Sequence, residues 1–294
     1  MKKEKACIDL HLHTTNSDGK LTPSQVVEEA VRLGLKAIAI TDHDSISGVK
    51  EAMAAARGRI EVIPGVEISC YEPELGYNEV HILGFFIDVE AKLINKLLEK
   101  SKQERIKQKK KIVKNLQRLG FKISFEEVVA ITKGEVGRPH VAEILFKKYP
   151  DKFSSINDVF KKYIRNGGPA YAERDHLTSI KEAVDAIVKS GGVAVLGHPF
   201  VFKQEDIPEL VEYFIECGGK GIETYYPYAK LYAHGGYDKE KEKKAIDYLK
   251  EIAKEKGLFE TGGSDFHGGD RTTVIDEMRI PYSVLEEIKK EANK

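Results

Sequence analysis

The sequence predicts an α/β barrel that is interrupted by a helical insertion, and two patterns carry this prediction. In residues 1–88 and 172–294, short β-rich runs alternate with amphipathic helical patterns, as in a parallel sheet flanked by helices. The number of these repeats favours a closed barrel over an open sheet. Residues 89–171 show helical patterns alone, so we expect them to form one insertion between two barrel strands.

Local signals place the first elements. The run Ala6–His13 is β-rich and ends in polar residues, which predicts a strand. Thr22 before Pro23 predicts a helix start, Gln25 completes a capping-box pattern, and Gly34 predicts the end of this helix. Before the insertion we also expect strand Lys36–Ile40, helix Val49–Ala56, and strands Ile60–Ile68 and Glu79–Phe86.

The insertion begins with a long helical pattern over Lys92–Leu119, and we expect the whole segment to contribute to substrate binding. Shorter helices are predicted at Phe125–Ile131, Val141–Lys148 and Ile156–Ile164. The alternation then returns with helix Ser179–Lys189, strand Val193–Leu196, helix Asp206–Glu216, strand Gly221–Tyr225, helix Lys239–Glu255, strand Leu258–Thr261 and a last helix near Val284–Ala292.

Composition excludes several classes of protein. With 41% hydrophobic residues in 294, the chain can bury a sizeable core, which excludes wholesale disorder. Forty-seven basic and 47 acidic residues give a net charge of zero, so no global electrostatic attraction to DNA or to a membrane surface is expected. The three cysteines lie far apart, and neither a signal peptide nor a membrane span is predicted. We therefore expect a cytoplasmic protein.

Histidines and carboxylates recur where the predicted strands end. Asp9, His11 and His13 alternate, so a period of two places them on one face of a strand. In a parallel barrel, side chains at the carboxyl ends of the strands converge on one mouth, where catalytic groups gather. We expect this mouth to receive the following further candidates: Asp18, His43, Glu67, His81, His198, Asp265 and His267.

Without Asp9, these candidates form a set of nine that predicts a metal site. One histidine taken alone is more often a core or surface residue, but buried polar groups in this number are costly unless paired or metal-bound. Nine nitrogen and oxygen ligands suffice for two or three divalent ions, and imidazole with carboxylate suits Mn²⁺, Fe²⁺ or Zn²⁺. Such clusters lower the pKa of a bound water and clamp phosphate oxygens, which favours phosphoester hydrolysis.

The motifs around these residues resemble one known family. They are Asp9-Leu10-His11-Leu12-His13-Thr14, Ser17-Asp18-Gly19, Thr41-Asp42-His43-Asp44, Gly65-Val66-Glu67, Gly197-His198-Pro199 and Gly263-Ser264-Asp265-Phe266-His267. In this order they are similar to the motifs of the polymerase-and-histidinol-phosphatase (PHP) family of metal-dependent phosphoesterases. The resemblance implies a distorted seven-stranded β/α barrel with a trinuclear metal site. It assigns His11, His13, Glu67 and Asp265 to the first ion, Glu67, His81 and His198 to the second, and Asp18, His43 and His267 to the third.

Within this family, two segments resemble the branch of bacterial 5′–3′ exoribonucleases and nucleoside 3′,5′-bisphosphate phosphatases. They are Ser17-Asp18-Gly19 and Gly137-Arg138-Pro139-His140 in the insertion. Histidinol phosphatases typically have a histidine in the first loop, so Asp18 counts against that substrate. The resemblance implies that Arg138 and His140 bind the substrate phosphate, with His140 as a candidate acid. The alternative is a helix start before Val141 that leaves Arg138 solvated.

Three further groups of residues have two interpretations each. Asp9 and Asp42 are expected to orient ligating imidazoles, with a purely structural role as the alternative. The run Lys107–Lys111 is typical of a solvated helix face, although with Arg105 it could guide a phosphate chain electrostatically. Two roles are open for the tyrosines Tyr225, Tyr226 and Tyr228: their rings could stack on a base, or they could pack beside a strand end.

The leading hypothesis is a metal-dependent phosphoesterase in which a metal-bound hydroxide attacks phosphorus. We expect a nucleotide or the 5′ end of a short RNA as substrate, no stable DNA complex and no membrane; the oligomeric state is left open. Alternatives are a histidinol-phosphatase-like or other small-molecule phosphatase, an amidohydrolase-like C–N hydrolase, and a non-enzymatic protein with structural metals.

Overall fold

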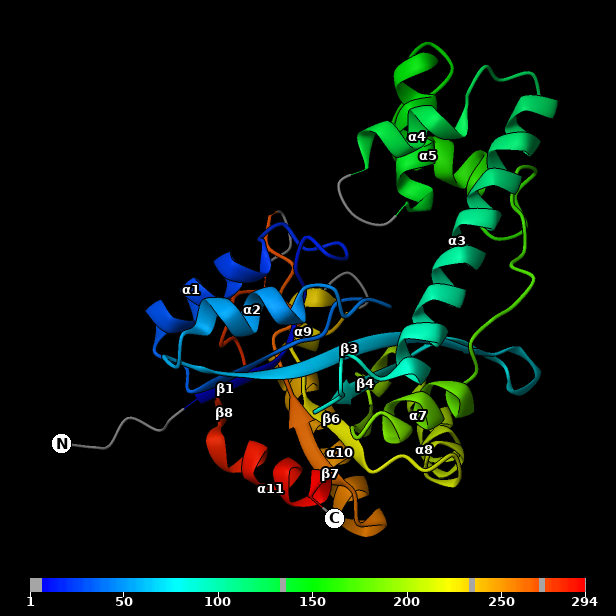
Figure 1. Cartoon of the computed structure of the whole chain (residues 1–294). Helices are drawn as coiled ribbons and strands as arrows, with labels where there is room; N and C mark the ends of the chain where they lie inside the picture. Colours follow the sequence, from blue (N-terminus) through cyan, green and yellow to red (C-terminus); the bar gives the residue numbers. More distant parts are fainter. Residues whose placement is uncertain (1–6, 133–135, 233–235, 270–272, 294) are drawn as a thin grey trace. The chain divides into compact units, whose positions relative to one another are not determined.

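A computed structural model describes residues 7–132, 136–232, 236–269 and 273–293 (Figure 1). Its contacts divide the chain into a larger unit, Met1–Leu97 with Thr178–Lys294, and a smaller unit, Leu98–Leu177. The sequence placed the corresponding boundaries near residues 89 and 171. A single long helix begins in the larger unit and continues into the smaller one.

The larger unit is built on one sheet that nearly closes into a barrel, as the sequence predicted. Its strand order is β7-β6-β5-β4-β3-β2-β1-β8. The gap between the first and seventh strands is bridged beyond their ends, where His13 N donates to Phe266 O at 2.9 Å. The strands are β1 (Cys7–Leu12), β2 (Ala37–Ile40), β3 (Glu61–Glu72), β4 (Tyr77–Phe85), β5 (Val193–Leu196), β6 (Gly221–Tyr225), β7 (Phe259–Gly262) and β8 (Ile280–Pro281).

The expectation of a wholly parallel sheet is wrong at two places. β4 runs antiparallel to both β3 and β5, and the short β8, which the sequence did not predict, runs antiparallel to β1. The reason lies in the connection between β3 and β4, a single 3₁₀ turn at Pro73–Leu75 followed by Gly76. A parallel crossover needs a dozen or more residues, so this short link allows only a hairpin.

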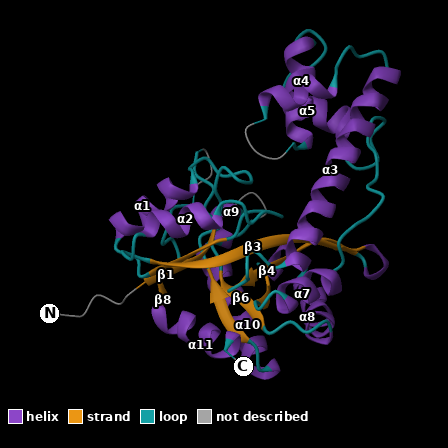
Figure 2. Ribbon diagram, viewed as in Figure 1, coloured by secondary structure: helices purple, strands orange, loops and turns teal. Residues whose placement is uncertain are grey.

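Helices cover the outside of this sheet (Figure 2). The predicted capping box of the first helix is confirmed: Thr22 N donates to Gln25 Oε1 at 2.9 Å and Gln25 N donates to Thr22 Oγ1 at 3.3 Å. Gly34 ends this helix in the left-handed region, at φ 78°. The helices are α1 (Pro23–Leu33), α2 (Val49–Ala56), α7 (Ile180–Lys189), α8 (Ile207–Glu216), α9 (Tyr228–Leu231), α10 (Lys239–Lys256) and α11 (Tyr282–Ala292).

Alternate residues of one strand face two different cores. Ala37 and Ala39 of β2 join an apolar cluster that includes residues of α11, whereas Ile38 and Ile40 pack with α1 and α2. This is the period of two expected for a strand buried on both faces.

The smaller unit is helical and has an apolar core of its own. The helix that leads into it, α3, spans Lys92–Arg118. It is followed by α4 (Phe125–Ile131), α5 (Arg138–Lys148) and α6 (Ile156–Val159), which continues as a π-helical turn over Phe160–Ile164. The core is formed by apolar side chains from these helices, such as Val113 and Leu116, together with Phe121 from the segment between α3 and α4.

Candidate metal centre

The predicted ligands are carried by strands β1, β3 and β4 and by the loops that follow β1, β2, β5 and β7. His11 lies in β1 and His13 follows its last residue, and both side chains are fully buried. β3 runs beyond its predicted end, so Glu67 lies within a long strand rather than at a strand end. His81 likewise lies within β4, the antiparallel partner of β3. The loop after β7 packs directly on β1, since a Cβ at Gly263 would lie 2.4 Å from His11 N.

Glu67 lies at the centre of the cluster, and its side chain is only 1% exposed. Its two carboxylate oxygens lie within 3.3 Å of nitrogen atoms from five imidazoles. The distances from Oε1 are 2.7 Å to His81 Nδ1 and 3.0 Å to His198 Nε2, and those from Oε2 are 3.0 Å to His43 Nδ1, 3.2 Å to His13 Nε2 and 3.3 Å to His11 Nε2.

Two aspartates complete the cluster. Asp265 Oδ1 lies 3.1 Å from His13 Nε2 and 3.6 Å from His11 Nε2. Asp18 Oδ1 lies 3.1 Å from His267 Nε2 and 3.9 Å from His13 Nδ1, and this carboxylate is 44% exposed. The structure therefore brings all nine predicted ligands together, with Asp18 on the side that faces solvent.

Four groups of ligand atoms lie close enough to share an ion. Within each group, the atoms are no more than 4.8 Å apart. The groups are His13 with Asp18, His43 and His267; His11 with Glu67 and His198; His11 with His13 and Asp265; and His43 with Glu67 and His81. They overlap with the three ligand sets that the family resemblance implied, without dividing the residues in the same way. The assignment of each residue to one ion therefore stays a prediction.

Several buried ligand atoms lack a hydrogen bond among the described residues. Buried atoms of this kind are expected where several groups point toward a common cation. Burying polar atoms without partners is costly, so the donor set fits divalent ions. The atoms are His11 Nε2, both ring nitrogens of His13, His43 Nδ1, Glu67 Oε2, His198 Nδ1 and His267 Nε2.

The cluster also shifts the pKa values of its members. Burial alone raises the pKa of a carboxyl group, yet the surrounding imidazoles prevail and hold the pKa of Glu67 and of Asp265 well below the ordinary range. Burial lowers the pKa of His43 to about 4. Burial acts in the same direction on His13, but Asp265 and Glu67 outweigh it and raise its pKa to about 9. The carboxylates are thus ionised at neutral pH, and a cation competes with a proton at His13.

The local backbone is strained at two candidate ligands. His198 has φ 25° and Asp265 has φ 47°, in the left-handed region that non-glycine residues rarely adopt. Such residues cost on the order of 1–3 kcal/mol each and cluster at functional sites.

Sequence reasoning missed the role of two residues that hold candidate ligands in place. The fully buried Glu223 of β6 lies with Oε1 2.9 Å from His11 Nδ1, and its Oε2 accepts from His198 N at 2.9 Å. Because a carboxylate only accepts, His11 donates through Nδ1, which leaves Nε2 as the ring nitrogen that could bind a metal. Tyr226 donates to Asp265 Oδ2 at 2.7 Å. The signal for Glu223 was a charged residue inside a buried strand, Gly221–Tyr225.

Asp9 and Asp42 contact loops rather than imidazole rings. Asp9 Oδ1 accepts from Ser264 N at 2.9 Å, next to the ligand Asp265. Asp42 Oδ1 accepts from Thr14 N at 2.7 Å and Oδ2 from Thr14 Oγ1 at 2.7 Å, beside His13. These carboxylates therefore support ligands by fixing the backbone of the loops that carry them. Burial raises the pKa of Asp9 to about 6.

The predicted phosphate-binding residues belong to the smaller unit. The Arg138 guanidinium lies 5.3 Å from the ring centroid of Phe160, and its Nη1 donates to Asn166 Oδ1 at 2.7 Å. His140 Nδ1 accepts from Gly137 N at 2.9 Å, at the N-terminus of α5. Both residues thus have contacts at a helix start, and their role toward a substrate stays a prediction.

Packing explains two of the three tyrosines near β6. Tyr226 is 1% exposed and Tyr228 is fully buried, so their rings pack within the larger unit. Tyr225 is partly buried, with Lys250 Nζ 4.3 Å from its ring centroid.

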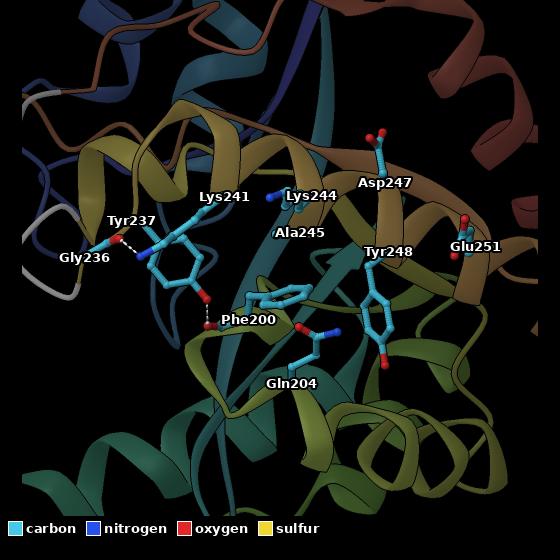
Figure 3. A pocket seen from close by; sticks show the side chains of 10 residues that line it. All are labelled: Phe200, Gln204, Gly236, Tyr237, Lys241, Lys244, Ala245, Asp247, Tyr248 and Glu251. Atoms are coloured by element: carbon cyan, nitrogen blue, oxygen red, sulfur yellow. Dashed lines mark hydrogen bonds between the residues drawn. The ribbon is translucent and has the colours of Figure 1, made fainter.

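A hollow of about 590 Å³ is separate from the cluster (Figure 3). It lies over α10 and the segment after β5, and Phe200, Gln204, Lys244 and Tyr248 contribute to its lining. None of the nine ligands is among its lining residues in the part of the chain that the structure describes.

A nearly closed α/β barrel whose strands and loops surround a buried imidazole–carboxylate cluster defines a metal-dependent hydrolase. A model of the PHP domain family matches residues 9–261. The chain belongs to this family, and it is a metal-dependent phosphoesterase.

Three characterised relatives cover most of the chain. It is 33% identical to a 5′–3′ exoribonuclease of Haemophilus influenzae, over 88% of this chain and 89% of the relative. It is 32% identical to a 3′,5′-nucleoside bisphosphate phosphatase of Chromobacterium violaceum, over 89% of this chain and 87% of the relative. It is 30% identical to a phosphoribosyl 1,2-cyclic phosphate 1,2-diphosphodiesterase of Eggerthella lenta, over 93% of this chain and 98% of the relative.

Two solved structures share the fold. One, from Bifidobacterium adolescentis, is described as a metal-dependent phosphoesterase; it has a TM-score of 0.76 and 27% identity, over 97% of this chain and 96% of that one. The other, from Chromobacterium violaceum, is described as an amidohydrolase with bound sulfate and no metal. It has a TM-score of 0.73 and 29% identity, over 97% of this chain and 96% of that one.

In the described residues, no helix is long and apolar enough to cross a membrane.

Proposed function

We propose that this protein hydrolyses phosphate esters of nucleotides, acting on nucleoside 3′,5′-bisphosphates, on the 5′ ends of short RNA, or on both. The observation that carries the proposal is the contact of one buried carboxylate, Glu67, with five imidazoles, four of which have a buried ring nitrogen without a hydrogen bond among the described residues. Such a donor set suits two or three divalent ions, of Mn²⁺, Fe²⁺ or Zn²⁺.

The chain's own residues divide the work at this site. The nine candidate ligands would hold the ions, which would neutralise charge on phosphate oxygens and acidify water when bound. Glu223 and Tyr226 fix the orientation of His11 and Asp265 through the hydrogen bonds described above. Asp18 is the exposed member of the set, so it borders the side from which a phosphate enters. Arg138 and His140 are proposed to bind that phosphate.

Two features support nucleotides as the substrate class. The loop Ser17-Asp18-Gly19 has an aspartate where histidinol phosphatases typically have a histidine. The names of two relatives refer to an exoribonuclease and to a nucleoside bisphosphate phosphatase. The Eggerthella lenta relative is named for a cyclic phosphate diester, which makes small phosphodiesters the second candidate class.

A substrate screen tests this proposal directly. The Mn²⁺-loaded protein is incubated with a nucleoside 3′,5′-bisphosphate, a short 5′-phosphorylated RNA, a cyclic phosphodiester and histidinol phosphate, and released phosphate or new phosphomonoester is measured. We expect the highest kcat/KM for one of the first two. Preference for histidinol phosphate or for the cyclic diester would overturn the substrate class, and release of ammonia from amide substrates without phosphatase activity would favour the amidohydrolase alternative.

A further inference from the structure

Charge is divided unevenly between the two units. The smaller unit, residues 98–177, contains 19 Lys and Arg against 10 Asp and Glu, a formal net charge of +9. Because the whole chain balances 47 against 47, the larger unit has 28 against 37, a formal net charge of −9. A barrel with this charge repels a polyanion, and two or three divalent ions offset only part of the repulsion.

Five cations of the smaller unit share one solvent-exposed face of α3. At 100° per residue they fall within an arc of about 100°, and at a rise of 1.5 Å per residue they span about 16 Å. The opposite face of the helix is buried in the core of the same unit. We name these five residues the basic stripe: Lys107, Lys110, Lys111, Lys114 and Arg118, all exposed.

Two members of the basic stripe are already paired with carboxylates. Lys107 Nζ lies 2.6 Å from Glu104 Oε1, and Lys111 Nζ lies 2.6 Å from Asp175 Oδ1. These pairs are partly or largely exposed, so they contribute little to stability and leave the local field positive.

The other three members have no carboxylate within ion-pair distance among the described residues. Lys110 Nζ lies 5.3 Å from the ring centroid of Phe125, and Lys114 and Arg118 follow it at intervals of one helical turn. They form a row of uncompensated cations in water, spaced by about 6 Å along the helix axis. Such a row attracts a chain of phosphates by releasing its counterions.

We propose that the basic stripe binds the phosphate backbone of single-stranded RNA. This inference rests on the proposed function and narrows it, because it makes a polynucleotide, not a mononucleotide, the preferred substrate. Lysine and arginine contacts to phosphate carry no sequence information, so binding depends on RNA length and salt rather than on sequence. An acidic membrane is the less favoured occupant, because the apolar face of α3 is buried and unavailable to lipid.

Kinetics of a triple variant test the inference. In K110Q/K114Q/R118Q we expect the KM for a 15-nucleotide 5′-phosphorylated RNA to rise about tenfold at low salt. The slope of log KM against log salt concentration should become smaller by about 2. The KM for a nucleoside 3′,5′-bisphosphate should not change. The matched control is K220Q/K243Q/K254Q, which removes the same charge from exposed lysines of the larger unit and should leave both values unchanged. Equal losses on both substrates, or no loss on RNA, would overturn the inference.

A binding measurement separates this inference from the proposed function. Fluorescence anisotropy of a labelled, hydrolysis-resistant phosphorothioate RNA of the same length reports binding even if no nucleotide is hydrolysed. Weaker binding by the stripe variant than by the control supports the inference, and equal binding by both overturns it. Co-sedimentation with phosphatidylserine vesicles that is lost in the stripe variant, with no RNA binding by the wild type, would assign the surface to a membrane instead.

Discussion

The two units of this protein place charged groups in opposite environments. In the larger unit, Glu67 and the imidazoles around it are withdrawn from water at the metal centre. In the smaller unit, the basic stripe lies in water above an apolar core. Buried charges need a specific partner at short range, whereas exposed ones act over a Debye length and depend on salt. One unit therefore carries charged groups suited to a specific reaction site, and the other carries charged groups suited to a general attraction for a polyanion.

The largest effect is expected at the centre of the buried cluster. Glu67→Gln removes the charge that faces five imidazoles, so it should lower kcat/KM by more than the roughly 100-fold that loss of a supporting partner costs. Bound metal, measured by elemental analysis after gel filtration, should fall as well. Full metal content with normal activity would show that Glu67 is not a ligand.

A smaller effect, on the affinity for metal, is expected when a residue that holds the candidate ligands in place is changed. Glu223→Gln weakens the hydrogen bonds to His11 Nδ1 and His198 N, and we expect metal affinity to fall about 10–100-fold in a chelator competition. The control is Glu260→Gln on the neighbouring strand β7, where the carboxylate accepts only from Thr224 Oγ1 in the described contacts, at 3.1 Å. An equal loss in both variants would mean that Glu223 acts through stability alone.

The pH dependence of stability should differ between the metal-free and the loaded protein. The pKa of His13 is raised from 6.5 to about 9 in the metal-free cluster, so its contribution is full below pH 6.5 and is lost as pH rises toward 9. Metal binding displaces this proton, so the affinity for metal should increase over the same range. Denaturant titrations at pH 6.5 and pH 9, with and without metal, should therefore give opposite trends. Parallel trends would contradict the placement of His13 among the ligands.

The smallest effects concern two matched helix caps, one in each unit. Thr22→Ala removes the capping box of α1, and Ser124→Ala removes that of α4, where Glu127 N donates to Ser124 Oγ at 3.2 Å. Each change should lower the free energy of unfolding by about 1 kcal/mol. Hydrogen exchange of the backbone amides, measured at increasing temperature, should show that protection from exchange is lost mainly in the unit that carries the change. Uniform loss of protection would mean that the two units unfold as one.

Local sequence signals were sufficient for most elements and for the residue types at the site. The capping pattern at Thr22 and the run Phe125–Ile131 depend on neighbouring residues only, and both formed as predicted. The alternation of Asp9, His11 and His13 also followed from strand geometry, because a strand places every second side chain on one face.

The tertiary structure decided which groups meet. The contact of Glu223 with His11 joins residues 212 positions apart, and the reversed direction of β4 moves His81 to Glu67 from a neighbouring antiparallel strand. Such pairings depend on how strands close into a barrel, which local propensity does not encode. The sequence by itself determined that imidazoles and carboxylates occur in sufficient number to bind metal; only the nearly closed sheet, by burying them around one carboxylate, brought them together.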